Sequence, residues 1–179
     1  MKFQPTPLEG VWLVDLDRHE DERGFFTRAW CREEFEAYGI DSGLSQISLS
    51  FNIQRGTLRG MHYQEAPNAE TKAVRCIHGA IFDVVLDLRP GSLTYCQWHG
   101  VKLSSDNYRM QVVPEGCAHG FQTLAADTEV LYLISAPYAP ESAVGVRWDD
   151  PTFGIQWPMS VSQLSERDAK YPDFKPQTT

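Results

Sequence analysis

The sequence predicts an all-β protein, and two observations carry this prediction. From Val11 onward, short runs of β-branched and aromatic residues are separated by Gly, Pro, Asn and Asp, which is typical of a sandwich or barrel. Helical periodicity is scarce, since in the first half only Cys31–Tyr38 places Phe35 and Tyr38 on one side among acidic neighbours. Strands this short and numerous cannot leave many edges unpaired, so we expect closure into a barrel or a two-sheet jelly roll.

The expected strands are the runs between successive turn signals. In chain order they are Val11–Leu16, Ile47–Phe51, Thr57–Tyr63, Ala73–Ile77, Ala80–Leu88, Trp98–Leu103, Met110–Val113, Ala118–Leu124, Glu129–Ser135 and Val144–Trp148. The later runs are separated by turns at Pro90-Gly91, Asp106-Asn107, Pro114-Glu115-Gly116 and Pro137 to Pro140. A second short helix is expected after Ser165, because Ser165 followed three residues later by Asp168 is typical of a helix N-cap.

Length and composition indicate one soluble domain over residues 1–179. A chain of 179 residues suits a single hydrophobic core, and 42% hydrophobic with 22% charged residues is a globular balance. No apolar run approaches the roughly 20 residues that span a bilayer, so no membrane partner is expected. The start MKFQPTPLEG lacks the features of a signal peptide, which predicts a cytoplasmic protein. The tail from Pro172 is expected to be loose.

The net charge and the cysteine spacing argue against nucleic-acid-binding, zinc-binding and dithiol redox proteins. The formal net charge of −8 argues against a nucleic-acid partner, although a single nucleotide diphosphate needs only a few well-placed cations. The four cysteines stand at wide, irregular spacings without a Cys-x-x-Cys pair, which indicates reduced structural thiols rather than a zinc or redox motif.

Two polar side chains interrupt the strand patterns in the first half. His62 shares a strand face with Leu58 and Gly60, and histidine is suited to abstract a proton near neutral pH. In isolation, a core histidine bonded to a backbone group is the preferred interpretation. Lys72 opens the strand Ala73–Ile77 and is suited to stabilise an oxyanion or a phosphate, although lysines at strand starts are often simply solvated.

Two further side chains interrupt the patterns in the second half. His119 lies between Gly116 and Gly120, and a structural turn would explain the glycines without explaining the histidine. Tyr132 lies within the apolar run 130–134, where tyrosine is usually a packing residue. A hydroxyl that projects into a cavity would instead be a weak acid able to deliver a proton.

Taken together, these segments resemble the dTDP-4-dehydrorhamnose 3,5-epimerase family of cupins over nearly the whole chain. The matching stretches are Asp21-Glu22-Arg23-Gly24-Phe25-Phe26, Gly56 to Gln64, Lys72, Asp83 to Arg89, Pro114 to Phe121, Arg147-Trp148-Asp149-Asp150-Pro151, and Ser165 to Asp168. The resemblance implies a cupin-type jelly-roll barrel with one or two short helices. It also implies an epimerase that inverts C3 and C5 of a nucleotide-linked 4-keto-6-deoxyhexose.

The resemblance also implies roles for individual residues. His62 would be the base, Asp168 would pair with its imidazole, Lys72 would stabilise the oxyanion, and Tyr132 would return a proton on the opposite face of the ring. Substrate-binding positions would be Arg23, Phe26, Arg28, Gln46, Ser48, Arg59, His119 and Tyr138. The family is typically dimeric, with a strand near the N-terminus exchanged, so a homodimer is expected.

No metal and no organic cofactor are expected. Many cupins bind a metal through a His-x-His pair followed by an acid and a later histidine. Here Gln64 stands two residues after His62, and only His119 is present at the second motif. Two imidazoles without the carboxylate are a poor site for a transition metal.

Three departures from the family pattern leave the substrate open. This chain has Arg28 and Ala143 where relatives commonly carry glutamate, and Ser48 where they carry asparagine. The alternatives are therefore an epimerase acting at C3 or C5 alone, or one acting on a CDP, GDP or UDP sugar. A 3,4-ketoisomerase and a non-catalytic sugar-binding cupin are further alternatives from other classes.

Overall fold

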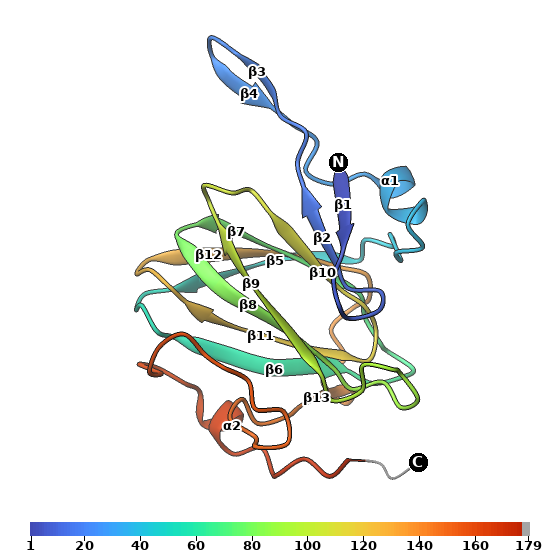
Figure 1. Ribbon diagram of the computed structural model, residues 1–179, viewed down its shortest axis with the longest axis vertical. Coiled ribbons are helices and arrows are strands. Elements are labelled where there is room, and N and C mark those ends of the chain that lie inside the picture. Colours follow the sequence, from blue (N-terminus) through green and yellow to red (C-terminus); the bar gives the residue numbers. More distant parts are fainter. Residues whose placement is uncertain (177–179) are drawn as a thin grey trace.

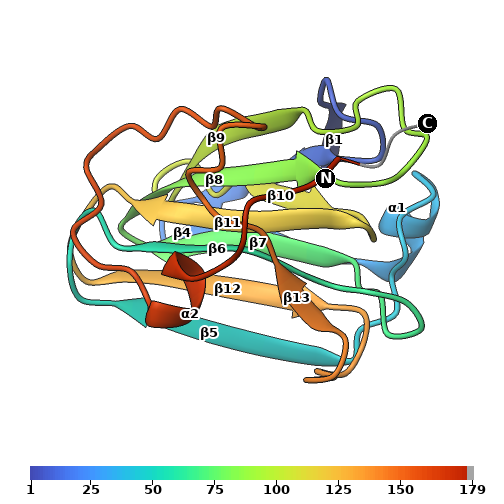
Figure 2. The ribbon, with the colours of Figure 1, turned by 90° about the horizontal axis from the view of Figure 1, so that it is seen from below.

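The computed structural model describes residues 1–176, in which two antiparallel sheets face one another (Figures 1 and 2). The six-stranded sheet has the order β1 (Lys2–Pro5), β2 (Trp12–Asp15), β10 (Met110–Val113), β7 (Lys72–His78), β12 (Thr128–Ile134) and β5 (Gln46–Asn52). The five-stranded sheet has the order β13 (Ala143–Gly145), β6 (Leu58–Gln64), β11 (Cys117–Thr123), β8 (Ala80–Asp87) and β9 (Trp98–Ser104). The expected all-β, cupin-like fold is confirmed.

Two short helices and one hairpin complete the fold. Helix α1 (Arg32–Glu36) lies beside β1 and β2, and helix α2 (Glu166–Ala169) lies beside β6 (Figure 1). Strands β3 (His19–Asp21) and β4 (Gly24–Phe26) form a separate hairpin that projects away from the barrel (Figure 1). The two expected helices are therefore present, each shorter than a typical helix.

The main core fills the space between the two sheets, and its residue Phe121 also lines the cavity described below. Its fully buried members come from both sheets and from the loop after β1: Leu8, Val11, Val74, Cys76, Ile81, Val85, Leu103, Val113, Cys117, Phe121 and Val130. The outer face of the five-stranded sheet is covered by the segment after β13, where Phe153 and Ile155 pack on Val84 and Leu86. The outer face of the six-stranded sheet is covered near Val14 and Met110 by Phe35 of α1.

The chain departs from the sequence-based expectation at both ends. Strand β1 was not expected because Lys2–Pro5 contains a single large apolar residue and a proline, which is tolerated at the sheet edge that it forms. Strands β3 and β4 are short and exposed, so they carry no burial pattern. The last expected strand, Val144–Trp148, is shorter and spans Ala143–Gly145.

The prediction of a loose tail from Pro172 is wrong for Asp173 and Phe174. Asp173 pairs with Arg147 at 2.5 Å, and the ring of Phe174 lies 4.9 Å from that of Phe153. The Phe174 amide also donates to Asp150 Oδ2 at 2.7 Å. A single phenylalanine between polar residues and prolines has no periodicity from which docking could be predicted. Residues 177–179 lie outside the part of the chain that the structure describes.

The cysteines are unpaired, as their spacing predicted. Cys31, Cys76, Cys96 and Cys117 are all free thiols. Burial raises the pKa of Cys76 to about 11 and that of Cys117 to about 12, so both stay protonated and unreactive. Within residues 1–176, no helix has the length and apolar character needed to cross a membrane.

A buried carboxylate organises the loop that joins β8 to β9. Asp87 is fully buried, and its two oxygens accept hydrogen bonds from Arg89, Ser92 and Thr94 at 2.6–3.0 Å. Burial raises the pKa of Asp87, but these hydrogen bonds outweigh it and hold the pKa well below the ordinary 3.8.

Replacing Asp87 by asparagine is expected to lower the free energy of unfolding by about 3 kcal/mol at pH 7, since Arg89 loses its buried partner. Because the folded-state pKa is depressed, this stabilisation is complete above the ordinary pKa of 3.8 and is lost as the pH falls below it. Urea unfolding should therefore show a difference in the free energy of unfolding between the unmodified protein and Asp87→Asn that narrows below about pH 4. In the matched control Asp149→Asn, at an exposed position, stability should change much less. A difference that is constant down to pH 3 would contradict the prediction.

Candidate active site

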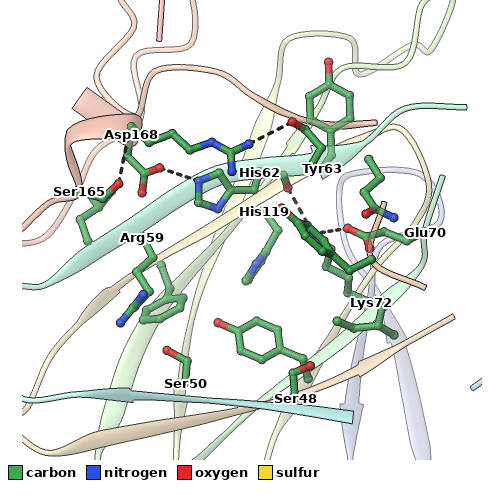
Figure 3. Close-up of a pocket in the computed structure, with 18 of the residues that line it drawn as sticks. Ser48, Ser50, Arg59, His62, Tyr63, Glu70, Lys72, His119, Ser165 and Asp168 are labelled. Carbon is green, nitrogen blue, oxygen red and sulfur yellow. Dashed lines mark hydrogen bonds and ion pairs between the residues drawn. The ribbon is translucent and has the colours of Figure 1, made fainter. Parts of the chain in front are cut away.

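A cavity of about 750 Å³ opens between the two sheets. Strands β5, β7 and β12 form one wall, strands β6 and β11 form the other, and the segment leading into α2 lies at its rim (Figure 3). The cavity is lined mainly by polar and aromatic side chains, with a few aliphatic residues such as Leu58 and Ile134. It is therefore the candidate functional site.

Strand β5 shows how the chain makes a polar wall inside a barrel. Its sequence QISLSFN alternates, so Gln46, Ser48 and Ser50 line the cavity while Ile47 and Leu49 point to the opposite face. The usual relation of apolar inside and polar outside is inverted along this strand. The inversion gives the cavity small hydroxyl groups opposite Tyr132 of β12.

A histidine and a carboxylate form a pair on the β6 wall. His62 Nε2 lies 2.7 Å from Asp168 Oδ1, and Asp168 Oδ2 accepts a hydrogen bond from the Gly60 amide at 3.2 Å (Figure 3). Burial raises the pKa of Asp168, but the bonds from His62 and Gly60 outweigh it, so the pKa lies below its ordinary value. Asp168 is therefore ionised and accepts the Nε2 proton, which leaves His62 Nδ1 with the free lone pair.

Local features fix both members of this pair. Ser165 is the N-cap of α2, and its side chain accepts a hydrogen bond from the Asp168 amide at 3.0 Å. On β6, Gly60 has φ +131°, and a Cβ there would lie 2.5 Å from the Gly120 Cα. Glycine is therefore required for β6 and β11 to approach closely, which places His62 directly opposite His119.

A second histidine and carboxylate lie deeper in the cavity. His119 Nε2 is 2.7 Å from Asp83 Oδ1, and both side chains are almost completely buried. The other oxygen of Asp83 has no hydrogen-bond partner within residues 1–176. The ring of His119 meets the ring of Tyr132 edge to face at 6.1 Å.

Tyr132 is a neutral phenol in this environment. Burial raises the pKa of Tyr132, and the negative charge of Asp83 raises it further, against smaller lowering effects of Arg59 and Ser50. Tyr132 thus holds its proton throughout the neutral range and is suited to donate it to a strong base.

Two cations complete the walls. Lys72 Nζ lies 2.7 Å from Glu70 Oε1 and 3.5 Å from the carbonyl oxygen of His62 (Figure 3). Arg59 Nε donates to Asn52 Oδ1 at 2.7 Å, which orients the guanidinium without neutralising its charge. Arg59 is therefore available to an anion, whereas Lys72 is already paired.

The structure brings together nine of the twelve residues that the sequence pointed to. The cavity is lined by His62, Tyr132, Asp168, Lys72, Gln46, Ser48, Arg59, His119 and Tyr138. The other three lie elsewhere in this chain. Arg23 pairs with Asp21 at 2.5 Å, Phe26 is 77% exposed on the projecting hairpin, and Arg28 pairs with Glu34 at 2.8 Å.

Sequence reasoning missed several residues of the site. Glu70 and Arg167 line the cavity, and Asp83 supports His119 from β8. Arg167 donates to the Tyr171 hydroxyl at 2.9 Å and to the Ala143 carbonyl at 3.0 Å. A signal existed for two of them, since Glu70 stands two residues before Lys72 and Arg167 stands beside Asp168.

The site has the parts of an acid and base catalyst. An imidazole with a free Nδ1 and an ionised partner can accept a proton, a protonated phenol can return one, and an ammonium can stabilise an oxyanion. In the part of the chain that the structure describes, no three His, Cys, Asp or Glu side chains are grouped so that they could hold a metal ion.

Comparisons with known proteins agree in one family. The profile described as dTDP-4-dehydrorhamnose 3,5-epimerase matches residues 5–176. A Sinorhizobium fredii protein named dTDP-4-dehydrorhamnose 3,5-epimerase is 43% identical over 175 residues, which covers 97% of this chain and 90% of that protein. A Streptomyces niveus protein named dTDP-4-dehydrorhamnose 3-epimerase is 38% identical over 169 residues, which covers 94% of this chain and 81% of that protein.

A solved structure shares the fold as well as the sequence. The dTDP-4-dehydrorhamnose 3,5-epimerase of Bacillus anthracis, crystallised with TDP and PPi bound, matches with a TM-score of 0.93 and 38% identity. The match covers 97% of this chain and 99% of that one.

Proposed function

Because this chain belongs to the dTDP-4-dehydrorhamnose 3,5-epimerase family, we propose that it inverts C3 and C5 of dTDP-4-dehydro-6-deoxyglucose to give dTDP-4-dehydrorhamnose. One observation carries the proposal. His62 of β6, paired with Asp168 of α2, and the protonated Tyr132 of β12 line the same cavity, and the two strands belong to opposite sheets. An inversion needs a base and an acid on opposite sides of a ring, and this arrangement supplies them.

The first step removes a proton from carbon. The C4 ketone acidifies the hydrogens on C3 and C5, and Nδ1 of His62 takes one of them while the C–H electrons move into an enolate. Asp168 stabilises the imidazolium that forms. Lys72 stabilises the enolate oxygen, a contribution of about 3 kcal/mol in comparable sites.

The second step returns a proton to the opposite face. Tyr132 donates its phenolic proton to the carbon, which inverts the centre and leaves a phenolate. Because the pKa of Tyr132 is raised, the phenolate recovers a proton from solvent, and His62 releases the one that it took. Arg59 is suited to hold the diphosphate, because no carboxylate within residues 1–176 forms an ion pair with it. No step requires a metal or an organic cofactor.

The closest alternative is inversion at C3 alone. The Streptomyces niveus relative carries the name of a 3-epimerase at an identity similar to that of several 3,5-epimerases. The departures from the family pattern at Ser48 and Ala143 also lie in the wall of the cavity. The same positions leave a different nucleotide open.

Deuterium exchange tests the proposal directly. The protein is incubated with dTDP-4-keto-6-deoxyglucose in heavy water, and deuterium entry at C3 and C5 is followed by NMR. Exchange with inversion at both carbons supports the 3,5-epimerase, and exchange at C3 alone supports the alternative. A protein that exchanges neither carbon with this substrate, but does so with a CDP, GDP or UDP sugar, would contradict the nucleotide assignment.

A homodimer is the second part of the proposal, and an exposed apolar face supports it. On the outer face of β5, Ile47 is 59% exposed, Leu49 66% and Phe51 53%. Ile53, which follows β5, and Ile77 of β7 are also exposed. Contiguous apolar surface of this kind on a sheet marks an interaction site.

Two further features fit a second copy of the chain as the occupant. Arg75, on β7 of the same sheet, is 6% exposed, and its Nε and Nη2 have no hydrogen-bond partner within residues 1–176. The β3–β4 hairpin, which carries Arg23 and Phe26, projects away from the barrel (Figure 1), and neither residue lines the cavity of its own chain. In a dimer this hairpin can reach the partner's cavity, where Arg23 and Phe26 could contribute to substrate binding.

Replacing Leu49 by aspartate is expected to convert the dimer into a monomer, because a carboxylate would be buried in an apolar interface. Sedimentation equilibrium should give about half the mass of the unmodified protein. The matched control is Leu93→Asp, since Leu93 is 94% exposed on the β8–β9 loop, and this variant should remain dimeric. A monomeric unmodified protein, or a Leu49→Asp variant of unchanged mass, would contradict the proposal.

A cytoplasmic location is the third part of the proposal. Four unpaired thiols suit a reducing compartment, in which disulfides rarely persist. Cell fractionation with detection of the protein tests this location.

A further inference from the structure

Two carboxylates of the described residues line the cavity, Asp168 and Glu70, and only Glu70 has no role in the proposed reaction. It lies in the loop before β7, lines the cavity and is 9% exposed. Its partner is Lys72, which is also 9% exposed, and the two charged groups are 2.7 Å apart. The ion pair is therefore inside the site and shielded from solvent.

The backbone fixes the direction of both side chains. Residues two apart in an extended segment point to the same side, so Glu70 and Lys72 both face the cavity. Thr71, between them, forms two hydrogen bonds with Ser135. Its amide donates to Ser135 Oγ at 2.9 Å, and its carbonyl accepts from the Ser135 amide at 3.0 Å. These two hydrogen bonds fix the backbone between Glu70 and Lys72, and the fixed backbone holds the carboxylate near the ammonium.

Lys72 carries three N–H donors, and groups within residues 1–176 occupy two of them. One meets Glu70 Oε1 at 2.7 Å and the second meets the His62 carbonyl at 3.5 Å. The three N–H bonds of an ammonium have a fixed tetrahedral arrangement. Once two of them are hydrogen-bonded, the direction of the third is therefore also fixed. Since Glu70, His62 and Lys72 all line the cavity, we expect the remaining donor to face the cavity.

The charge of Glu70 matters as well as its position. A buried ammonium without a counterion is costly and tends to lose its proton, and a neutral amine cannot stabilise an enolate as well as an ammonium does. The other anions of the site are engaged elsewhere, since Asp168 pairs with His62 and Asp83 with His119. Glu70 is the only carboxylate in the described chain that forms an ion pair with Lys72.

We propose that Glu70 is a positioning residue that holds Lys72 as an oriented ammonium, with one N–H directed at the enolate oxygen. This inference rests on the proposed function for its effect on turnover, but the state of Lys72 can be measured without substrate. Glu70 acts through Lys72 and makes no contact with the reacting atoms in this assignment.

The test compares Glu70→Gln, which keeps the shape and removes the charge, with Glu70→Asp, which keeps the charge on a shorter side chain. Both proteins are first compared with the unmodified protein by circular dichroism and thermal unfolding. The first readout is the –NH₃⁺ signal of Lys72 in ¹⁵N-lysine-labelled protein, assigned by its absence in Lys72→Arg. We expect this signal in the unmodified protein and in Glu70→Asp, and its loss in Glu70→Gln.

The second readout is turnover. We expect Glu70→Gln to lower kcat by about 10²-fold with KM nearly unchanged, because misplacement of a group acting in the transition state costs this much. Glu70→Asp should recover at least about tenfold of that loss. A folded Glu70→Gln protein that keeps the Lys72 signal would overturn the inference. An unmodified protein that is inactive on every nucleotide sugar would contradict the proposed function instead, while the NMR comparison would still decide the role of Glu70.

Discussion

Replacing His62 by asparagine is expected to lower kcat by about 10³-fold or more, with substrate affinity changed only slightly. Asparagine can keep a hydrogen bond to Asp168 but has no lone pair basic enough to remove a proton from carbon. The loss should therefore fall on the chemical step and not on binding. Deuterium exchange at C3 and C5 should disappear together with turnover.

The matched control is His78→Asn, because His78 is exposed at the end of β7 and is not among the residues that line the cavity. This variant should exchange deuterium at the rate of the unmodified protein. Isothermal titration with dTDP would show whether His62→Asn still binds the nucleotide. Normal exchange in His62→Asn would remove the imidazole from the mechanism and leave the cavity without an assigned base.

Replacing Tyr132 by phenylalanine is expected to lower kcat for inversion by about 10²-fold or more. The pKa of Tyr132 is raised, chiefly by burial and then by the charge of Asp83, so the residue enters the reaction as an acid. Without its hydroxyl, the enolate can still form on the His62 side, and His62 can return the proton to the same face. Deuterium should therefore enter carbon with retention of configuration, faster than inverted product appears.

This separation of exchange from inversion distinguishes the acid from a packing residue. Tyr38→Phe is the control, since Tyr38 stacks on Phe3 near the N-terminus and does not line the cavity. Parallel loss of exchange and inversion in Tyr132→Phe would indicate a damaged site rather than a missing acid. Inversion at the normal rate would assign the proton to another group.

The central strands could be predicted because their residues are locally consistent. Met110–Val113 was expected with the bounds that the structure has, and the runs around β7, β8 and β12 were displaced by only a residue or two at their ends. Ser165 was expected as a helix N-cap and is one. β1, β3 and β4 were missed because their pairing, not their composition, makes them strands.

The roles of the site residues came from motifs rather than from periodicity. A lone histidine, lysine or tyrosine within a strand has a structural explanation that sequence cannot exclude. The pairs Glu70–Lys72 and Asp83–His119 were missed for the same reason, since nothing local distinguishes a paired carboxylate from a solvated one. The proposed catalytic roles are supported only where the fold brings two of these side chains within hydrogen-bonding distance of each other.

By itself, the sequence determined that this chain is a β barrel and which side chains alternate on each strand. A period of two separates Ser48 from Leu49 on any strand, but it does not say which of the two faces a cavity. Only the pairing of β5 with β12 decided that the serines face inward and the apolar residues outward. The tertiary structure also joined His62 to Asp168 across 106 positions of the chain and left Arg23, Phe26 and Arg28 outside the cavity. The physical reason is that local propensity acts over a few residues, whereas a site is assembled by contacts between segments distant in sequence.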